Sequence, residues 1–84
     1  MKILFHPKAA KFLKKVDKEI KERILKKIKR LKENKNLGKH LRYSNFRSLR
    51  IGDYRAIYEI EKNKIITLFI GHRKNVYEDF SKLF

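Results

Sequence analysis

The chain has 84 residues, enough for one small hydrophobic core, and we expect residues 1–84 to form a single domain. Lysine and arginine number 24 against nine aspartate and glutamate residues, so the net charge of +15 favours a polyanionic partner. The chain has no cysteine, and its three histidines are too far apart for a helical ligand pair, so we expect no metal and no cofactor. No segment approaches the ~20 apolar residues of a membrane span, which predicts a cytoplasmic protein without a membrane partner.

The positive charge is concentrated in the first half of the chain. Residues 1–42 carry 16 basic and four acidic residues, a net +12, whereas residues 43–84 carry eight and five, a net +3. A general attraction to a polyanion and a specific site can therefore lie in different halves.

The first elements are a strand and two helices. Residues 2–5 form an apolar run that ends at His6-Pro7, and a proline favours the first turn of a helix. Apolar residues then recur at helical spacing, at Ala9, Phe12, Leu13 and Val16 in a first helix and at Ile20, Ile24, Ile28 and Leu31 in a second, which Asp17 can cap. Residues 33–40 lack an apolar period and predict a connection in which Gly38 can adopt a positive φ.

The second half of the sequence predicts strands. The runs 46–51, 54–60 and 65–71 are separated by turns of hairpin length, which indicates three antiparallel strands. Val76, Phe80, Leu83 and Phe84 lie near helical spacing and predict a short C-terminal helix. The expected fold is α+β: two N-terminal helices packed on an antiparallel sheet, in the order β-α-α-β-β-β, followed by that short helix.

Alternation along the strands predicts where the arginines point. Tyr54 and Tyr58 share one face with other core residues, so Arg55 points to the opposite face, together with Arg50 across the turn. After the last strand come His72, Arg73, Lys74 and Tyr77, at the end of the same sheet. Two guanidinium groups on one face repel each other unless an anion joins them.

Such a group of arginines suits RNA cleavage. Arginine binds phosphate through two parallel hydrogen bonds, and several around one phosphate stabilise a phosphorane transition state. In this chemistry the 2′-hydroxyl of RNA attacks the adjacent phosphate while a base accepts its proton and an acid protonates the leaving 5′-oxygen. Glu59 and His72 are both candidates for the base, and the residues alone do not decide between them.

Two segments resemble the RelE/ParE toxin superfamily, and in particular the RelE-like mRNA interferases. They are "RSLRIGDYRAIYEI", residues 47–60, and "FIGHRKNVYEDF", residues 69–80. The resemblance implies a toxin of a type II toxin–antitoxin system that cleaves translated mRNA in the ribosomal A site without a metal. It also implies partners: the ribosome, its mRNA and an acidic RelB-like antitoxin that silences the toxin.

By position, Arg55 and Arg73 resemble the two phosphate-stabilising arginines of the family, and Tyr77 resembles its base-stacking tyrosine. The family carries a pair of lysines on a strand where this chain has Arg47 and Arg50, so the general base is not identified by the resemblance. Some relatives use a histidine near the end of the sheet, which makes His72 a candidate. The catalytic set expected from the resemblance is Arg50, Arg55, His72, Arg73 and Tyr77, with Arg47 and Lys74 as further RNA contacts.

Two other functions stay open. A ParE-like inhibitor would bind DNA gyrase and cleave nothing, although that branch generally lacks the arginine and tyrosine set. A basic RNA-binding module without catalysis would be explained by the net charge of +15 alone.

Overall fold

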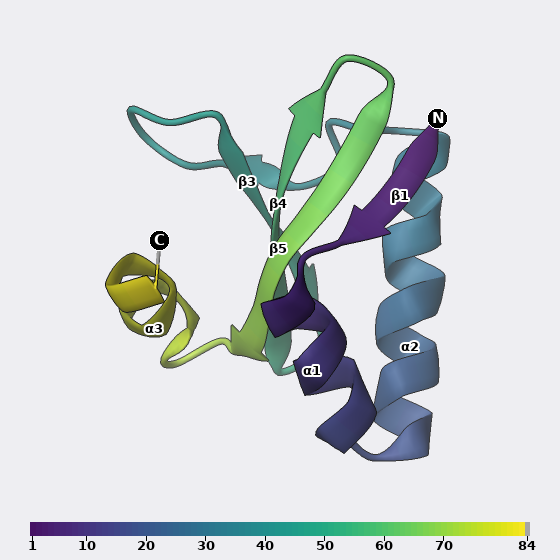
Figure 1. Cartoon of the computed structure of the whole chain (residues 1–84), viewed down its shortest axis with the longest axis vertical. Coiled ribbons are helices and arrows are strands. Elements are labelled where there is room, and N and C mark those ends of the chain that lie inside the picture. The colour runs from purple at the N-terminus through teal and green to yellow at the C-terminus, as the bar shows by residue number, and fades with distance from the viewer. Residues whose placement is uncertain (84) are drawn as a thin grey trace.

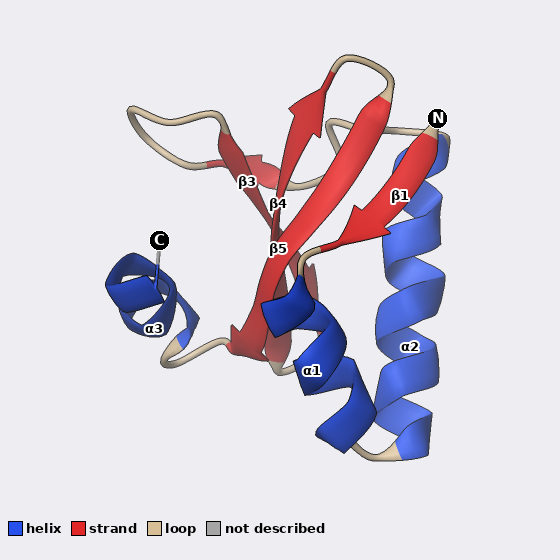
Figure 2. Cartoon of the chain, viewed as in Figure 1, coloured by secondary structure: helices blue, strands red, loops and turns tan. Residues whose placement is uncertain are grey.

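The computed structural model describes residues 1–83 and contains three α-helices, a short 3-10 helix and five strands (Figures 1 and 2). In chain order these are β1 (Lys2–Phe5), α1 (Pro7–Lys15), α2 (Lys18–Lys29), the 3-10 helix Arg30–Lys32, β2 (Lys39–His40), β3 (Phe46–Ile51), β4 (Tyr54–Glu61), β5 (Lys64–His72) and α3 (Val76–Leu83). None of the described helices has both the length and the apolar character that crossing a lipid bilayer requires.

All five strands form one sheet, in the order β1-β5-β4-β3-β2. The α+β class and the order of helices and strands are confirmed, but the sheet is mixed, because β1 runs parallel to β5 while the other pairs are antiparallel. β2 was not predicted. It has only two residues, Lys39 and His40, and so carries no alternation that a sequence pattern could reveal.

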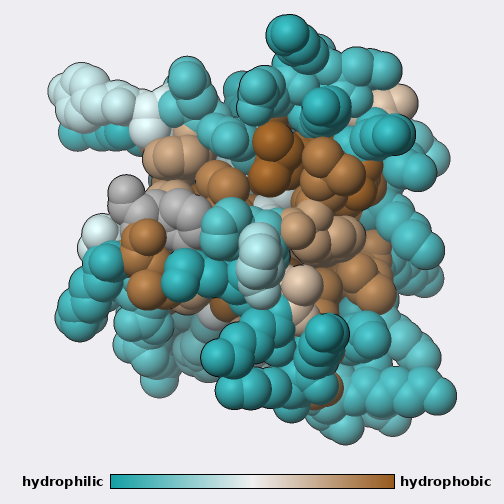
Figure 3. All heavy atoms as spheres, viewed as in Figure 1, coloured by the Kyte–Doolittle hydropathy of each residue, from teal (hydrophilic) through white to brown (hydrophobic). Residues whose placement is uncertain are grey.

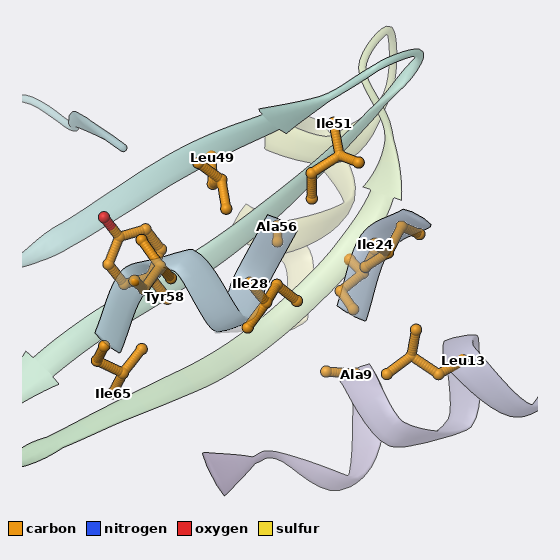
Figure 4. Close-up of a cluster of buried hydrophobic side chains, with 11 residues drawn as sticks. Ala9, Leu13, Ile24, Ile28, Leu49, Ile51, Ala56, Tyr58 and Ile65 are labelled. Carbon is orange, nitrogen blue, oxygen red and sulfur yellow. The ribbon is translucent and has the colours of Figure 1, made fainter. Parts of the chain in front are cut away.

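The larger core lies between the sheet and helices α1 and α2 (Figure 4). Ile24 and Ile28, one turn apart on α2, are buried to 0% and 1% exposure against strand residues such as Leu49. Tyr58 is also fully buried in this core, and Tyr54 packs at its margin. The apolar spacing of both helices is therefore explained by burial of one face of each helix.

The opposite face of the sheet is covered in part by α3 (Figure 1). Val76 and Phe80 of this helix are buried against Ile57 and Leu68. The ring of Phe80 lies edge-on to that of Phe46, with 5.2 Å between their centroids. The expected C-terminal helix is thus present and packed on the sheet; Phe84, which also contributed to that expectation, lies outside the described residues.

Gly38 was expected at a positive φ, and this was wrong: Gly52, in the turn between β3 and β4, is the glycine with a positive φ, 59°. A glycine is needed at position 38 because the Tyr58 side chain packs directly against its backbone. A Cβ on Gly38 would lie 2.7 Å from the Tyr58 hydroxyl oxygen, which no real Cβ tolerates. The Gly38 N–H donates to that same oxygen over 3.0 Å, so the glycine lets the buried phenol bind the backbone directly.

Candidate functional site

The face of the sheet that carries α3 also carries the polar residues of the candidate site. Ser48 pairs with Ile57, and Arg50 pairs with Arg55, so all four residues point to this face. Leu49 and Ala56, between them, point to the helix-covered core. The prediction that Arg55 points away from the face of Tyr54 and Tyr58 agrees with this pairing.

Arg55 and Tyr77 meet at Ser48. The Nη1 group of Arg55 donates to Ser48 Oγ over 3.2 Å, and the Tyr77 hydroxyl donates to the same oxygen over 3.1 Å. The Arg55 guanidinium carbon lies 5.9 Å from the centre of the Tyr77 ring, within the range of a cation–π contact. Ser48 is buried, whereas Tyr77 is 42% exposed. A fixed guanidinium beside an accessible aromatic ring suits a ligand that combines a phosphate with a planar base.

Arg73 is held at the turn between β3 and β4. Its backbone N–H donates to the Asp53 carbonyl over 2.8 Å, and its Nε lies 3.6 Å from an Asp53 carboxylate oxygen. The Arg73 side chain is still 44% exposed, so it can bind a further anion. Gly71, two residues earlier, pairs with Arg55, which brings Arg73 to the same end of the sheet.

Arg50 occupies a separate position. Its Nε donates to the Gly52 carbonyl over 3.2 Å, and Arg50 contributes, with Ile51 and Gly52, to a cleft of about 250 Å³ between the end of β3 and α2. The other cations of that cleft all come from α2 and the residue that follows it, and are Arg23, Lys26, Lys27 and Arg30. Arg50 therefore belongs to a cationic surface rather than to the hydrogen bonds around Ser48.

Two further candidate residues lie away from Ser48. Arg47 pairs with Tyr58, on the face of the helix-covered core, and its Nη1 donates to the Gly38 carbonyl. His72 pairs with Tyr54 on that same face, and its Nδ1 accepts from the Lys74 backbone N–H. The structure thus brings Arg55 and Tyr77 together but places His72 and Arg47 on the other side of the sheet.

Glu59 shares the face of Arg55 but lies four residues further along β4. It pairs with Phe46, which packs against α3. A carboxylate at this position is on the correct face but is displaced from the Ser48 hydrogen bonds, as its distance from the turn in the sequence indicated.

Sequence reasoning did not single out Ser48, although a signal was present. Ser48 precedes Arg50 by two residues in a strand, so alternation already places both on one face. Only the register shows that Ser48 lies beside Arg55, and only the position of α3 shows that Tyr77 reaches it.

Among the described residues, no group of three His, Asp or Glu side chains is arranged to hold a metal ion. One phenol has a shifted pKa. Burial raises the pKa of Tyr58, opposed in part by its hydrogen bond from Gly38 and by the positive charge of Arg47. This residue lies in the helix-covered core and supports the fold rather than the site.

Comparisons with a family model, with a related sequence and with solved structures all point to toxins of toxin–antitoxin systems. The family described as "ParE toxin of type II toxin-antitoxin system, parDE" matches residues 3–77. Toxin RelE3 of Methanocaldococcus jannaschii is 32% identical over 87 residues, which cover 95% of this chain and 99% of that protein. The toxin–antitoxin complex RelB-RelE from Methanococcus jannaschii contains a chain that matches with a TM-score of 0.72 and 31% identity, over 92% of this chain and 98% of its own. The isolated E. coli RelE toxin matches with a TM-score of 0.76 over 98% of this chain and 96% of its own, at 20% identity, which is a likeness of fold.

The chain therefore belongs to the ParE toxin family of type II toxin–antitoxin systems, and within it is a RelE-like toxin. The resemblance of residues 47–60 and 69–80 to the RelE/ParE superfamily is confirmed.

Proposed function

We propose that this toxin is an endoribonuclease that cleaves mRNA on the ribosome. The observation that carries the proposal is the pair formed by Arg55 and Tyr77, joined through Ser48 on an accessible face. Arg55 would bind the scissile phosphate, and Tyr77 would stack on an adjacent base. Arg73, partly exposed at the same end of the sheet, would add a second guanidinium.

The proposed reaction uses the chemistry of RNA itself. The 2′-hydroxyl oxygen attacks the adjacent phosphorus, the bond to the 5′-oxygen breaks, and a 2′,3′-cyclic phosphate and a 5′-hydroxyl result. Negative charge grows on the phosphorane oxygens, and fixed guanidinium groups stabilise it more than they stabilise the substrate. The proposal assigns the proton transfers to neither His72 nor Glu59, because neither lies beside Ser48.

Ribosome dependence is supported by the charge distribution. The cleft between β3 and α2 gathers five cations, Arg23, Lys26, Lys27, Arg30 and Arg50, away from the Ser48 hydrogen bonds. Such a surface binds the phosphate backbone of RNA without reading its sequence, and releases counterions as it does so. It would hold the toxin on ribosomal RNA while Arg55 acts on mRNA, and the proposed site of action is therefore the cytoplasm.

We further propose an antitoxin partner. The solved relative from Methanococcus jannaschii is a complex of RelE with the antitoxin RelB. In this chain, Leu4 of the edge strand β1 is 41% exposed and pairs with Ile66. Figure 3 shows apolar side chains over β1 and β5, ringed by hydrophilic ones. An acidic amphipathic segment would fit both the apolar area and the positive surroundings.

The test is to add the purified toxin to a translating extract and map new 5′ ends on a reporter mRNA, with free mRNA in parallel. We expect cuts within the translated frame only when ribosomes are present. Arg55→Met should lower the cleavage rate by about 10²–10³-fold, as the loss of one transition-state donor does. Lys21→Met, which also removes one positive charge but lies on the exposed side of α2, is the matched control. Intact mRNA with unimpaired translation would refute the proposal.

A second candidate function is inhibition of DNA gyrase. The match to the ParE family over residues 3–77 is the observation that favours it. A supercoiling assay with purified gyrase decides between the two, because an interferase leaves supercoiling unchanged at concentrations that stop translation.

A further inference from the structure

The two-residue strand β2 places a lysine beside the candidate site. Lys39 pairs with Ser48 in the β2–β3 register, and paired residues of antiparallel strands point to the same face. Lys39 therefore shares the face of Arg55 and Tyr77, the two residues that donate to Ser48. The family resemblance could not indicate this, because Lys39 lies outside both matching segments.

Lys39 also lines a cleft between α3 and the chain segment formed by β2 and the start of the β2–β3 loop. The cleft measures about 400 Å³. Its walls are four consecutive residues, Lys39, His40, Leu41 and Arg42, on one side and Tyr77 of α3 on the other. Two of these residues are cations, none is acidic, and the volume lies within the roughly 300–1,000 Å³ of small-ligand sites. Figure 1 shows that the β2–β3 loop and α3 lie on the same side of the sheet.

The backbone that carries Lys39 is fixed before any ligand arrives. Tyr58 donates its hydroxyl hydrogen to the Lys35 carbonyl over 2.9 Å and accepts from the Gly38 N–H. Arg47 donates to the Gly38 carbonyl, and the Leu41 N–H donates to the Phe46 carbonyl over 2.9 Å. Because the backbone is already fixed, only the Lys39 side chain has to become ordered when it binds an anion, which favours affinity.

We propose that this cleft binds the nucleotide next to the scissile phosphate, with the Lys39 ammonium on its phosphate and the Tyr77 ring against its base. This inference rests on the proposed cleavage of RNA and adds a substrate-binding residue to it. The half-exposed aromatic ring distinguishes the ligand from an acidic peptide, because a nucleotide offers both a phosphate and a flat base to these two side chains.

The first experiment measures binding without cleavage. A short fluorescein-labelled 2′-O-methyl RNA oligonucleotide cannot be cut, since its attacking hydroxyl is blocked, and fluorescence anisotropy gives its Kd over a range of salt concentrations. Lys39→Met should weaken binding about tenfold and lower the slope of log affinity against log salt by about 0.7, the value for one lost phosphate contact on a single strand. Lys39→Arg should restore most of the affinity. Lys21→Met, outside the clefts described above, should change the affinity far less.

The second experiment measures cleavage of ribosome-bound mRNA by the same variants. Equal behaviour of Lys39→Met and Lys21→Met in both assays would overturn the inference while leaving cleavage by the wild type intact. Absence of cleavage by the wild type, with Lys39-dependent binding of the oligonucleotide, would refute the proposed function but support the nucleotide site. Thermal unfolding of each variant checks that the fold is retained.

Discussion

Tyr77 and Ser48, 29 residues apart in sequence, are joined by a hydrogen bond of 3.1 Å between the phenol and the serine Oγ. The same Oγ accepts from Arg55 over 3.2 Å. One buried hydroxyl therefore fixes both a guanidinium from the sheet and an aromatic ring from the C-terminal helix. Because the bond from Arg55 uses one N–H, the other donors of that guanidinium stay available for a ligand.

We predict that Ser48→Ala lowers cleavage about tenfold, because it removes the oxygen that orients Arg55 and Tyr77, and each such bond contributes about 1 kcal/mol. The measurement is the single-turnover cleavage rate of ribosome-bound mRNA. Ser81→Ala is the control, since the Ser81 hydroxyl donates to the Glu78 carbonyl within its own helix. An unchanged rate in Ser48→Ala would show that Arg55 and Tyr77 keep their positions without the serine.

Phe80→Ala should release α3 from the sheet. Phe80 is 8% exposed and packs against Phe46 and Phe69, so its truncation should cost about 3–5 kcal/mol of packing where α3 docks. We expect faster amide exchange throughout α3 and a cleavage rate reduced as strongly as in Tyr77→Ala. Leu83→Ala, at a position 47% exposed, should have little effect. Full activity with α3 released would contradict a role for Tyr77.

Thr67→Val should stabilise the protein. The Thr67 hydroxyl is buried on β5, and no hydrogen-bond partner for it is present among the described residues. A methyl group in its place removes that desolvation penalty at nearly constant shape, so we expect the free energy of unfolding to rise by about 1 kcal/mol. Urea unfolding provides the measurement, with Thr67→Ala as the comparison that leaves a cavity. A decrease in Thr67→Val would indicate that the hydroxyl is bonded in solution.

Tyr58→Phe tests how the stability contributed by the buried Tyr58 hydroxyl depends on pH. Losing the hydroxyl leaves the Gly38 N–H and the Lys35 carbonyl without their partner, which should cost about 1–3 kcal/mol at pH 7. The pKa of Tyr58 is raised above the ordinary value of 10.0, so its contribution is fully present below pH 10.0 and is lost as pH rises toward the folded value. The stability difference between wild type and Tyr58→Phe should therefore shrink between pH 7 and about pH 11 in urea unfolding experiments. A stability difference that does not change with pH would contradict the raised pKa of Tyr58.

Much of this fold can be predicted from local sequence patterns, because burial of one face of a helix or strand produces a regular apolar spacing. Ile24 and Ile28 reveal α2 because one helix face is covered by the sheet, and Arg55 is placed on the correct face because side chains alternate. The parallel pairing of β1 is not readable, since an edge strand of four residues has the same apolar pattern in either direction.

The site was less predictable, because it depends on register. Lys39 lies in a strand of two residues, and no sequence pattern around it indicates that it pairs with Ser48. His72 was a candidate general base at the end of the sheet, but its pairing with Tyr54 turns it to the other face from Arg55. Gly38 was interpreted as a turn glycine, whereas its role is set by Tyr58, a residue 20 positions away.

The pairing of β1 with β5 also affects when the sheet can be completed during synthesis. Lys2 pairs with Lys64, so the partner of the first strand lies 62 residues later, 64 minus 2, and Tyr77 follows later still. A nascent chain cannot complete the sheet until residues 64–72 have left the ribosome, and such distant pairing is slow to form. If the toxin cleaves mRNA on the ribosome as proposed, this topology would delay cleavage until most of the chain has left the ribosome, so a nascent toxin would not act on the ribosome that is still synthesising it.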